Sequence, residues 1–260
     1  MIKLLSTDFD GTLINHDAHP TVEPALFELF GEMRKSGVLW AMNTGRGLNH
    51  ALEGLEHFHF PFAPDFILAS EREVFRQSVK GAGWEDFGDW NRRCTETHNE
   101  LFISARPIVE EILLFLKSET DAQAIHENSI PVGLMASSHE EMERVVRFID
   151  AARRRWPKFH YQRNTQYLRF CHIDYDKGAA LGELARLTGI AREDIFAAGD
   201  HYNDISMLDG RYARWSACPA NSVDAVKETV RKAGGYVAEN VCSKGVVEAL
   251  EHFCNGSLSR

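Results

Sequence analysis

The chain has 260 residues, 44% of them hydrophobic and 26% charged, with a formal net charge of −9. These values are ordinary for a folded globular protein with a substantial core. The excess of negative charge argues against nucleic acids and anionic membrane surfaces as partners, because both normally require a basic patch.

No apolar stretch approaches the ~20 residues that span a bilayer. The residues before the first predicted strand do not show the charged and then apolar pattern of a secretory signal peptide. We therefore expect a cytoplasmic protein without a membrane partner. The five cysteines are widely spaced and form no Cys-x-x-Cys pair, so the sequence predicts buried thiols rather than a zinc site or a disulfide framework.

Short runs that are apolar on both faces predict the strands of a parallel sheet covered by helices. Between the first two runs, Leu26, Leu29, Phe30 and Met33 form one helical stripe, and Gly37 ends the helix. The expected strands are residues 4–7, 38–43, 66–69, 195–198, 213–217 and 236–238; the expected helices are residues 22–35, 48–57 and 178–187. This alternation predicts an α/β fold with a Rossmann-like parallel-sheet core.

The pattern changes between about residues 81 and 174. The expected helices there are residues 107–117 and 139–156, and the expected strands are residues 122–125, 131–136, 159–162 and 167–171. We interpret this region as a smaller α+β domain inserted into the parallel one. The predicted division is residues 1–80 with 175–260 for the core and residues 81–174 for the insert.

Two carboxylates directly follow the first predicted strand, in the sequence Asp8-Phe9-Asp10-Gly11-Thr12-Leu13. Buried like charges this close require a cation, a shared proton or a function. Asp8 is a candidate nucleophile toward phosphorus, and Asp10 a candidate general acid and base. Thr12 would bond to Asp10 or shape the turn. The alternative is a solvated turn in which these residues only reverse the chain.

Thr44-Gly45-Arg46 follows the second predicted strand. A hydroxyl group and free backbone N–H groups at a helix N-terminus form a corner that suits a phosphate. Arg46 is a candidate for binding that phosphate with two hydrogen bonds. The alternative is that Thr44 only caps the next helix and Arg46 points to solvent.

Lys177 begins a predicted helix, where the helix dipole favours anions over cations. This unfavourable placement suggests that the lysine neutralises Asp8 and a bound phosphate. Taken alone, Asp176-Lys177-Gly178 is better explained by an ordinary loop, in which this sequence is common.

Gly199-Asp200-His201-Tyr202-Asn203-Asp204 follows the predicted strand at residues 195–198. Asp200 and Asp204 share a face if a helical turn begins there. With Asn203 they offer the hard oxygen ligands that Mg²⁺ prefers, and the alternative is a capping aspartate with a solvated first turn. Because Asp8, Thr44 and Asp200 all follow parallel strands, the residues are expected to meet at the carboxyl edge of the sheet, where such folds bind ligands.

These motifs, in this order, resemble those of the haloacid dehalogenase superfamily, and specifically its Cof-type phosphatase branch. The segments that carry the resemblance are Asp8–Leu13, Asn43–Arg46, Asp176–Leu181, Gly199–Leu208 and the turn Pro219-Ala220-Asn221-Ser222. The resemblance covers both core segments and, in the middle of the chain, only the position of the insert.

The resemblance implies a magnesium ion held by Asp8, the carbonyl of Asp10 and Asp200, with Asp204 supporting them. It further implies that Thr44 and Lys177 hold the phosphate, and that the insert is a cap that closes over the site and selects the substrate. Gly45, Arg46 and Asn203 complete the expected substrate contacts. One departure is that Ser70-Glu71-Arg72-Glu73 stands where this branch usually carries an Asn-Gly turn, which places the substrate range in question.

The leading hypothesis is a magnesium-dependent phosphatase that acts on small phosphorylated metabolites, sugar phosphates in particular. A phosphosugar mutase on the same core and a non-catalytic regulatory or binding protein are the alternatives. Dehalogenation is disfavoured because Asp10 supplies an acid and base that carbon–halogen displacement does not need. The sequence leaves the substrate and the oligomeric state open.

Overall fold

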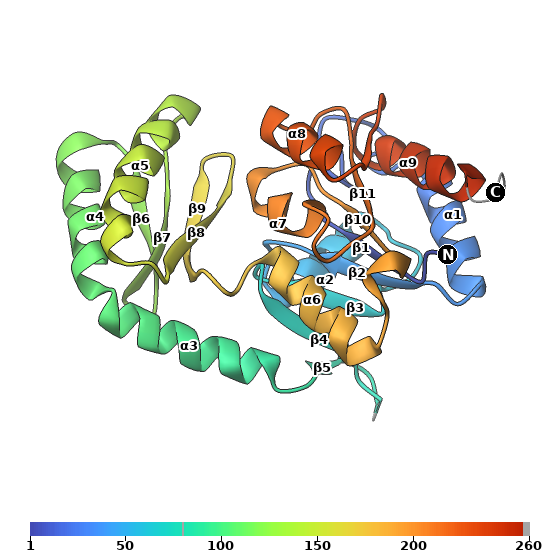
Figure 1. Cartoon of the computed structure of the whole chain (residues 1–260), viewed down its shortest axis with the longest axis horizontal. Helices are drawn as coiled ribbons and strands as arrows, with labels where there is room; N and C mark the ends of the chain where they lie inside the picture. Colours follow the sequence, from blue (N-terminus) through green and yellow to red (C-terminus); the bar gives the residue numbers. More distant parts are fainter. Residues whose placement is uncertain (80, 257–260) are drawn as a thin grey trace. The chain divides into compact units, whose positions relative to one another are not determined.

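The computed structural model describes residues 1–79 and 81–256, with the side chains of residues 255 and 256 left out of the description. The chain forms two compact units, Met1–Asn91 with Lys177–Arg260, and Arg92–Asp176. The first unit is called the core unit below, and the second the inserted unit. The parallel-sheet α/β fold with a smaller inserted α+β part, expected from the sequence, is confirmed (Figure 1).

The core unit is built on an eight-stranded sheet in the order β12-β11-β10-β1-β2-β3-β4-β5. Its strands are β1 (Leu4–Thr7), β2 (Leu39–Asn43), β3 (Phe66–Ala69), β4 (Glu73–Gln77), β5 (Trp84–Asp86), β10 (Ile195–Ala198), β11 (Trp215–Cys218) and β12 (Tyr236–Val237). The six strands from β12 to β3 pair in parallel, whereas β4 and β5 add antiparallel pairs at one edge. The sequence did not predict β4 and β5, because their few residues are only partly buried.

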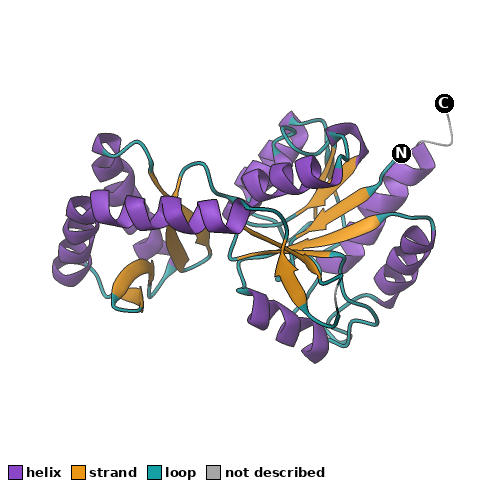
Figure 2. Cartoon of the chain, turned by 90° about the horizontal axis from the view of Figure 1, so that it is seen from below, coloured by secondary structure: helices purple, strands orange, loops and turns teal. Residues whose placement is uncertain are grey.

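Helices cover both faces of this sheet (Figure 2). They are α1 (Pro24–Lys35), α2 (Leu48–His57), α6 (Lys177–Thr188), α7 (Ile205–Leu208), α8 (Asp224–Lys232) and α9 (Cys242–Gly256), with short 3-10 helices at Arg192–Asp194 and Tyr202–Asp204. Apolar residues of α1, α2 and α9 share one core cluster with β1, β2, β3 and β10. Every one of Leu4, Leu5, Ser6 and Thr7 in β1 is buried, as expected for a central strand covered on both faces.

The inserted unit is a four-stranded antiparallel sheet in the order β6-β7-β9-β8 with helices. Its elements are α3 (Trp90–Ser104), which begins just before the unit, α4 (Arg106–Glu119), β6 (Gln123–Glu127), β7 (Ile130–Met135), α5 (His139–Ala152), a 3-10 helix at Arg153–Arg155, β8 (Phe159–Asn164) and β9 (Tyr167–His172). Apolar residues of α4, α5 and the sheet form a second core cluster. The sequence did not predict α3, because its polar composition hides the helical period.

Two further expectations concern the cysteines and the possibility of a membrane-spanning helix. All five cysteines are free thiols, four of them buried. Among the described residues, no helix is long and apolar enough to cross a membrane. The division into a catalytic core and a substrate-selecting cap stays a prediction.

Candidate active site

The candidate site is built at the carboxyl edge of the core sheet by turns that follow β1, β2 and β10. Asp8 directly follows β1, and its backbone N–H donates to the carbonyl of Ala198 at the end of β10 (2.8 Å). Asp200 follows β10 by two residues, and Thr44 follows β2 directly. The sequence argument that parallel strands bring these residues to one edge therefore describes the observed arrangement.

A fully buried lysine joins two of the aspartates. Lys177 Nζ donates to Asp8 Oδ1 (2.5 Å) and to Asp204 Oδ1 (2.6 Å). Its side chain is 0% exposed, which is tolerable for a charge only because both contacts are ion pairs. Burial alone would lower the pKa of Lys177, but the two carboxylates more than reverse this effect and raise it. The lysine is thus held in its cationic form.

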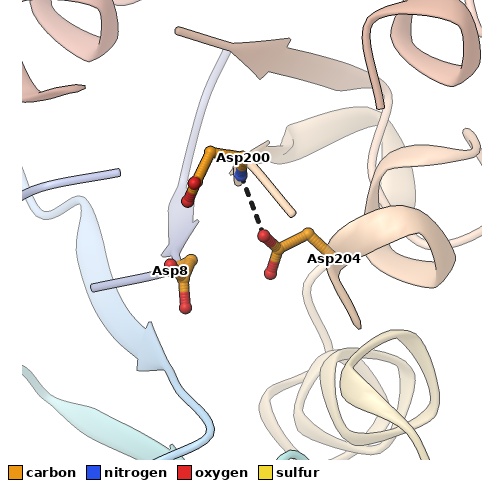
Figure 3. A group of neighbouring side chains, drawn as sticks. All are labelled: Asp8, Asp200 and Asp204. Carbon is orange, nitrogen blue, oxygen red and sulfur yellow. Dashed lines mark hydrogen bonds between the residues drawn. The ribbon is translucent and has the colours of Figure 1, made fainter. Parts of the chain in front are cut away.

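Three carboxylates surround one small space (Figure 3). Ligand oxygens of Asp8, Asp200 and Asp204 all lie within 4.8 Å of one another. Burial, followed by repulsion from Asp204, raises the pKa of Asp200 to about 7. Burial also raises the pKa of Asp8, and the neighbouring aspartates add to this, against the opposing effect of Lys177. One lysine therefore leaves an excess of negative charge, which is the condition a divalent cation relieves.

The bonding of Asp204 distinguishes it from the other two carboxylates. Its Oδ2 accepts hydrogen bonds from the backbone N–H groups of Asp200 and His201, both at 2.8 Å, while Oδ1 accepts from Lys177. Gly199 makes this possible, since a Cβ there would lie 2.5 Å from Asp204. Asp204 is thus committed to holding the turn and the lysine.

The side chain of Asp200 is held in position by residues of the segment Asp8–Leu13 rather than by its own segment, Gly199–Leu208. Thr12 Oγ1 donates to Asp200 Oδ1 (2.7 Å). The expectation that Thr12 bonds to Asp10 is therefore wrong. Gly11 has φ +80°, and a Cβ there would come within 2.5 Å of Asp200 Oδ2, so the Asp-Gly-Thr sequence also serves as the packing surface for Asp200.

Asp10 is held by a pair of bonds that the sequence did not reveal. Arg46 donates from Nε to Asp10 Oδ2 (2.7 Å) and from Nη2 to Oδ1 (2.6 Å), and His16 Nε2 lies 2.9 Å from Oδ1. Burial would raise the pKa of Asp10, but these hydrogen bonds and charges lower it. The guanidinium also lies over the Phe9 ring, 5.1 Å from its centroid. Arg46, expected at a phosphate, contacts the candidate acid and base instead.

Thr44 and Gly45 form the expected corner after β2. Thr44 is buried, and its Oγ1 accepts from the backbone N–H of Arg46 (3.1 Å). Asn43, for which the sequence suggested no role, donates from Nδ2 to the carbonyl of Lys177 (3.0 Å). The corner is thereby tied to the backbone that carries the lysine.

Asn203 also lies at this edge, and its side chain is 3% exposed. Its Nδ2 donates to Glu71 Oε1 (2.8 Å), whereas its Oδ1 has no hydrogen-bond partner. Further along the chain, Asn221 donates to the carbonyl of Gly11 (2.8 Å) and accepts from the backbone of Cys242 (2.8 Å). The Asn221 turn therefore braces the first motif from the far end of the core unit.

Sequence comparison places the chain among known proteins. The sequence profile described as haloacid dehalogenase-like hydrolase matches residues 109–250. A Bacillus subtilis protein named putative phosphatase YxeH is 23% identical over 281 residues, covering 97% of this chain and 98% of the relative. A phosphoglycolate phosphatase of Methanosarcina acetivorans is 38% identical over 76 residues, covering 29% of this chain and 31% of the relative.

A solved structure shows the same fold over nearly the whole chain. The sucrose-phosphatase of Synechocystis, determined in complex with sucrose and phosphate, superposes with a TM-score of 0.71 at 18% sequence identity. The match covers 97% of this chain and 98% of that one.

Proposed function

Because the chain belongs to the haloacid dehalogenase-like hydrolases and is a phosphatase, we propose that it hydrolyses small phosphorylated metabolites with Mg²⁺ and through an aspartyl-phosphate. The observation that carries this proposal is the buried contact of Asp8 with Lys177 beside Asp200 and Asp204. A strand-end carboxylate next to a fixed cation and a cluster of oxygen ligands suits attack on a phosphate.

The residues fit a magnesium ion by the chemistry of their donors, which are all carboxylate oxygens. We assign Asp8 and Asp200 as direct ligands together with the carbonyl of Asp10. Asp204 supports them from behind, because both of its oxygens already accept hydrogen bonds. When bound, the ion neutralises charge on the phosphate and orients it.

The chain's own residues supply the two chemical steps. An oxygen of Asp8 forms a bond to phosphorus as the bond to the leaving oxygen breaks, and Asp10 gives that oxygen its proton. A water molecule then attacks phosphorus, returns a proton to Asp10, and frees Asp8 and inorganic phosphate. Thr44, Gly45, Asn203 and Lys177 hold the phosphate throughout.

Arg46 is assigned here to Asp10 rather than to the substrate. Its two hydrogen bonds hold Asp10 in the charged form, which is the form required of a general base. Protonation of Asp10 for the first step requires that these bonds loosen. The arginine therefore positions Asp10 and favours the form that it needs as a general base.

Sugar phosphates are the first substrates to test, since the sucrose-phosphatase shares the fold of the chain. The inserted unit, Arg92–Asp176, is proposed to select the substrate. The inserted unit has a sheet, helices and a hydrophobic core of its own. It is therefore large enough to provide a binding surface for the substrate.

The test is phosphate release from a panel of sugar phosphates, other phosphorylated metabolites and an aryl phosphate, with Mg²⁺ or with a chelator. We expect release that requires Mg²⁺. Asp8→Asn should lower it by at least about 10³-fold, and Asp17→Asn, the same change at an exposed position, should leave it intact. Undiminished release from a folded Asp8→Asn protein would refute the assignment, and isomerisation of a hexose phosphate without free phosphate would indicate a mutase.

A further inference from the structure

The peptide that joins Lys177 to Gly178 is held by a side chain at each end. Asn43, the last residue of β2, donates from Nδ2 to the carbonyl of Lys177 (3.0 Å). Ser206, in α7, accepts at Oγ from the backbone N–H of Gly178 (3.0 Å). The oxygen and the hydrogen of one planar peptide are thus bonded to two different elements, which fixes the orientation of that plane at the base of the lysine side chain. This arrangement is called the peptide clamp below.

The packing around the peptide clamp leaves little freedom for this peptide. Gly178 lies so close to α7 that a Cβ there would overlap the carbonyl oxygen of Ser206, and the start of α6 lies beside α7 (Figure 1). Asn43 is 0% exposed. Its Nδ2 also lies 3.5 Å from Met207 Sδ, so the amide connects β2 to both α6 and α7.

Lys177 is also held at the far end of its side chain. Two of the three N–H bonds of its ammonium group are used by Asp8 and Asp204. Among the described hydrogen bonds, the third has no acceptor in the protein, and it is the one that can bind a phosphate. Because the four-carbon stem of a lysine is flexible, the direction of that N–H depends on the backbone as well as on the two carboxylates.

We propose that Asn43 and Ser206 are positioning residues, which act through the peptide clamp to aim the ammonium group of Lys177 at the phosphate. This inference rests on the proposed phosphatase function. In that reaction Asp8 becomes an acyl phosphate and loses its carboxylate charge, so its ion pair with Lys177 weakens while the phosphate must still be held. The peptide clamp consists of neutral groups, and this change of charge leaves its hydrogen bonds intact.

The test compares Ser206→Ala, which removes the acceptor, with Ser206→Thr, which keeps a hydroxyl group. Competitive inhibition by inorganic phosphate is measured during aryl phosphate hydrolysis with saturating Mg²⁺. For Ser206→Ala we expect the inhibition constant of phosphate to rise and kcat/KM to fall, each by about tenfold, which is below the ~10²-fold cost of a 1 Å misplacement. Asn43→Ala should resemble Ser206→Ala, and Ser206→Thr should retain the parent values.

Thr188→Val is the matched control, because it removes a side-chain hydrogen bond at the other end of α6, from Thr188 Oγ1 to the carbonyl of Leu184 (2.8 Å). It should leave the inhibition constant unchanged. A purely structural role of the peptide clamp would lower the folded fraction, and with it the apparent kcat, without changing the inhibition constant. That result for both Ser206→Ala and Asn43→Ala would overturn the proposal, as would an equal rise in Thr188→Val.

A double variant tests whether the effect passes through Lys177. In Lys177→Met with saturating Mg²⁺, the further change Ser206→Ala should not raise the inhibition constant of phosphate again, because the group that it positions is absent. A second tenfold rise in the double variant would show that Ser206 acts by another route, and it would overturn the proposal.

A second measurement follows Lys177 without any substrate. The ammonium protons of a buried lysine are protected from exchange with water, and their NMR signal is assigned to Lys177 by its loss in Lys177→Met. We expect this signal to shift and to exchange faster in Ser206→Ala and Asn43→Ala but not in Thr188→Val. If the parent hydrolyses no phosphate ester, the phosphatase function fails; an unchanged signal in both variants would separately overturn the role of the peptide clamp.

Discussion

The two units bury charged groups for opposite purposes. In the core unit, Asp8, Asp200, Asp204 and Lys177 gather at one edge of the sheet with more negative than positive charge. In the inserted unit, the buried carboxylate of Glu141 accepts from the backbone N–H groups of Asp121 and Ser137, both at 2.7 Å. The first arrangement prepares a binding site at a cost in stability, and the second stabilises the fold.

The pKa directions express this difference. Burial first, and then neighbouring carboxylates, raise the pKa of Asp8 and Asp200. Hydrogen bonds from Ser137 and then Asp121 lower the pKa of Glu141, against the effect of burial. The ionised form is therefore disfavoured at the site and favoured in the inserted unit, so the stability of the two units should depend on pH in opposite directions, and only the core unit should respond to metal.

The largest effect is expected for Lys177→Met. The substitution removes the only cation bonded to Asp8 and Asp204 among the described hydrogen bonds, and it should destabilise the metal-free core unit by about 3–5 kcal/mol. Urea unfolding in the presence of a chelator measures this loss, while amide exchange in α4 and α5 reports whether the inserted unit is spared. Saturating Mg²⁺ should reduce the loss. A core unit equally stable without Lys177 would contradict the charge balance described here.

Second in size is the pH dependence of Asp200. A carboxyl group whose pKa rises from 3.8 when unfolded to about 7 when folded binds its proton more tightly in the folded state. Stability should therefore fall as pH increases from about 4 to 7, by roughly 2–4 kcal/mol for this group. Asp200→Asn should flatten that slope in chelator and weaken stabilisation by Mg²⁺. Asp224→Asn, at an exposed position, is the control, and a slope unchanged by Asp200→Asn would be the contrary result.

The sequence predicted that Asp8, Thr44 and Asp200 lie at one edge of the sheet, because each follows a parallel strand. It predicted Lys177 beside Asp8 for a different reason, namely its unfavourable charge at a helix N-terminus. It could not predict which side chains would pair within the site. Thr12 reaches Asp200, and Arg46 reaches Asp10, across separations of 188 and 36 residues. Which side chains bond to each other depends on their rotamers and on the space that glycines leave free. Neither produces a repeating pattern in the sequence that could be recognised.

The inserted unit was predicted less completely for a related reason. Its amphipathic helices and strands show the periods of their apolar faces, whereas α3 (Trp90–Ser104) has a weak apolar pattern. The edge strands β4 and β5 of the core unit were missed for the same reason. Glu141 also gave no signal, because acidic residues in the first turn of a helix are common and usually exposed. Its two backbone contacts come from the tertiary structure.

A third, smaller effect is expected for Glu141, whose buried carboxylate stabilises the inserted unit. Glu141→Gln should destabilise the inserted unit by about 1–2 kcal/mol, because the carboxylate accepts through both oxygens whereas glutamine has one acceptor oxygen, so one backbone N–H loses its acceptor. Since its folded pKa is lowered from 4.5, the parent's advantage is present above pH 4.5 and is lost as pH falls through the folded value. Amide exchange in α4 and α5 measures it. Glu140→Gln, the exposed neighbour, should cost less at every pH.

The smallest effect expected is a gain in stability at the edge of the site. Ser70 has φ 52°, a conformation that glycine adopts without steric cost. Ser70→Gly should therefore stabilise the core unit by about 0.5–1 kcal/mol, after the greater freedom of glycine in the unfolded chain is counted. Ser36→Gly, at φ −85°, relieves no strain and should not stabilise. If Ser70→Gly were destabilising in urea unfolding, contacts of the Ser70 side chain would outweigh the steric cost of its positive φ angle.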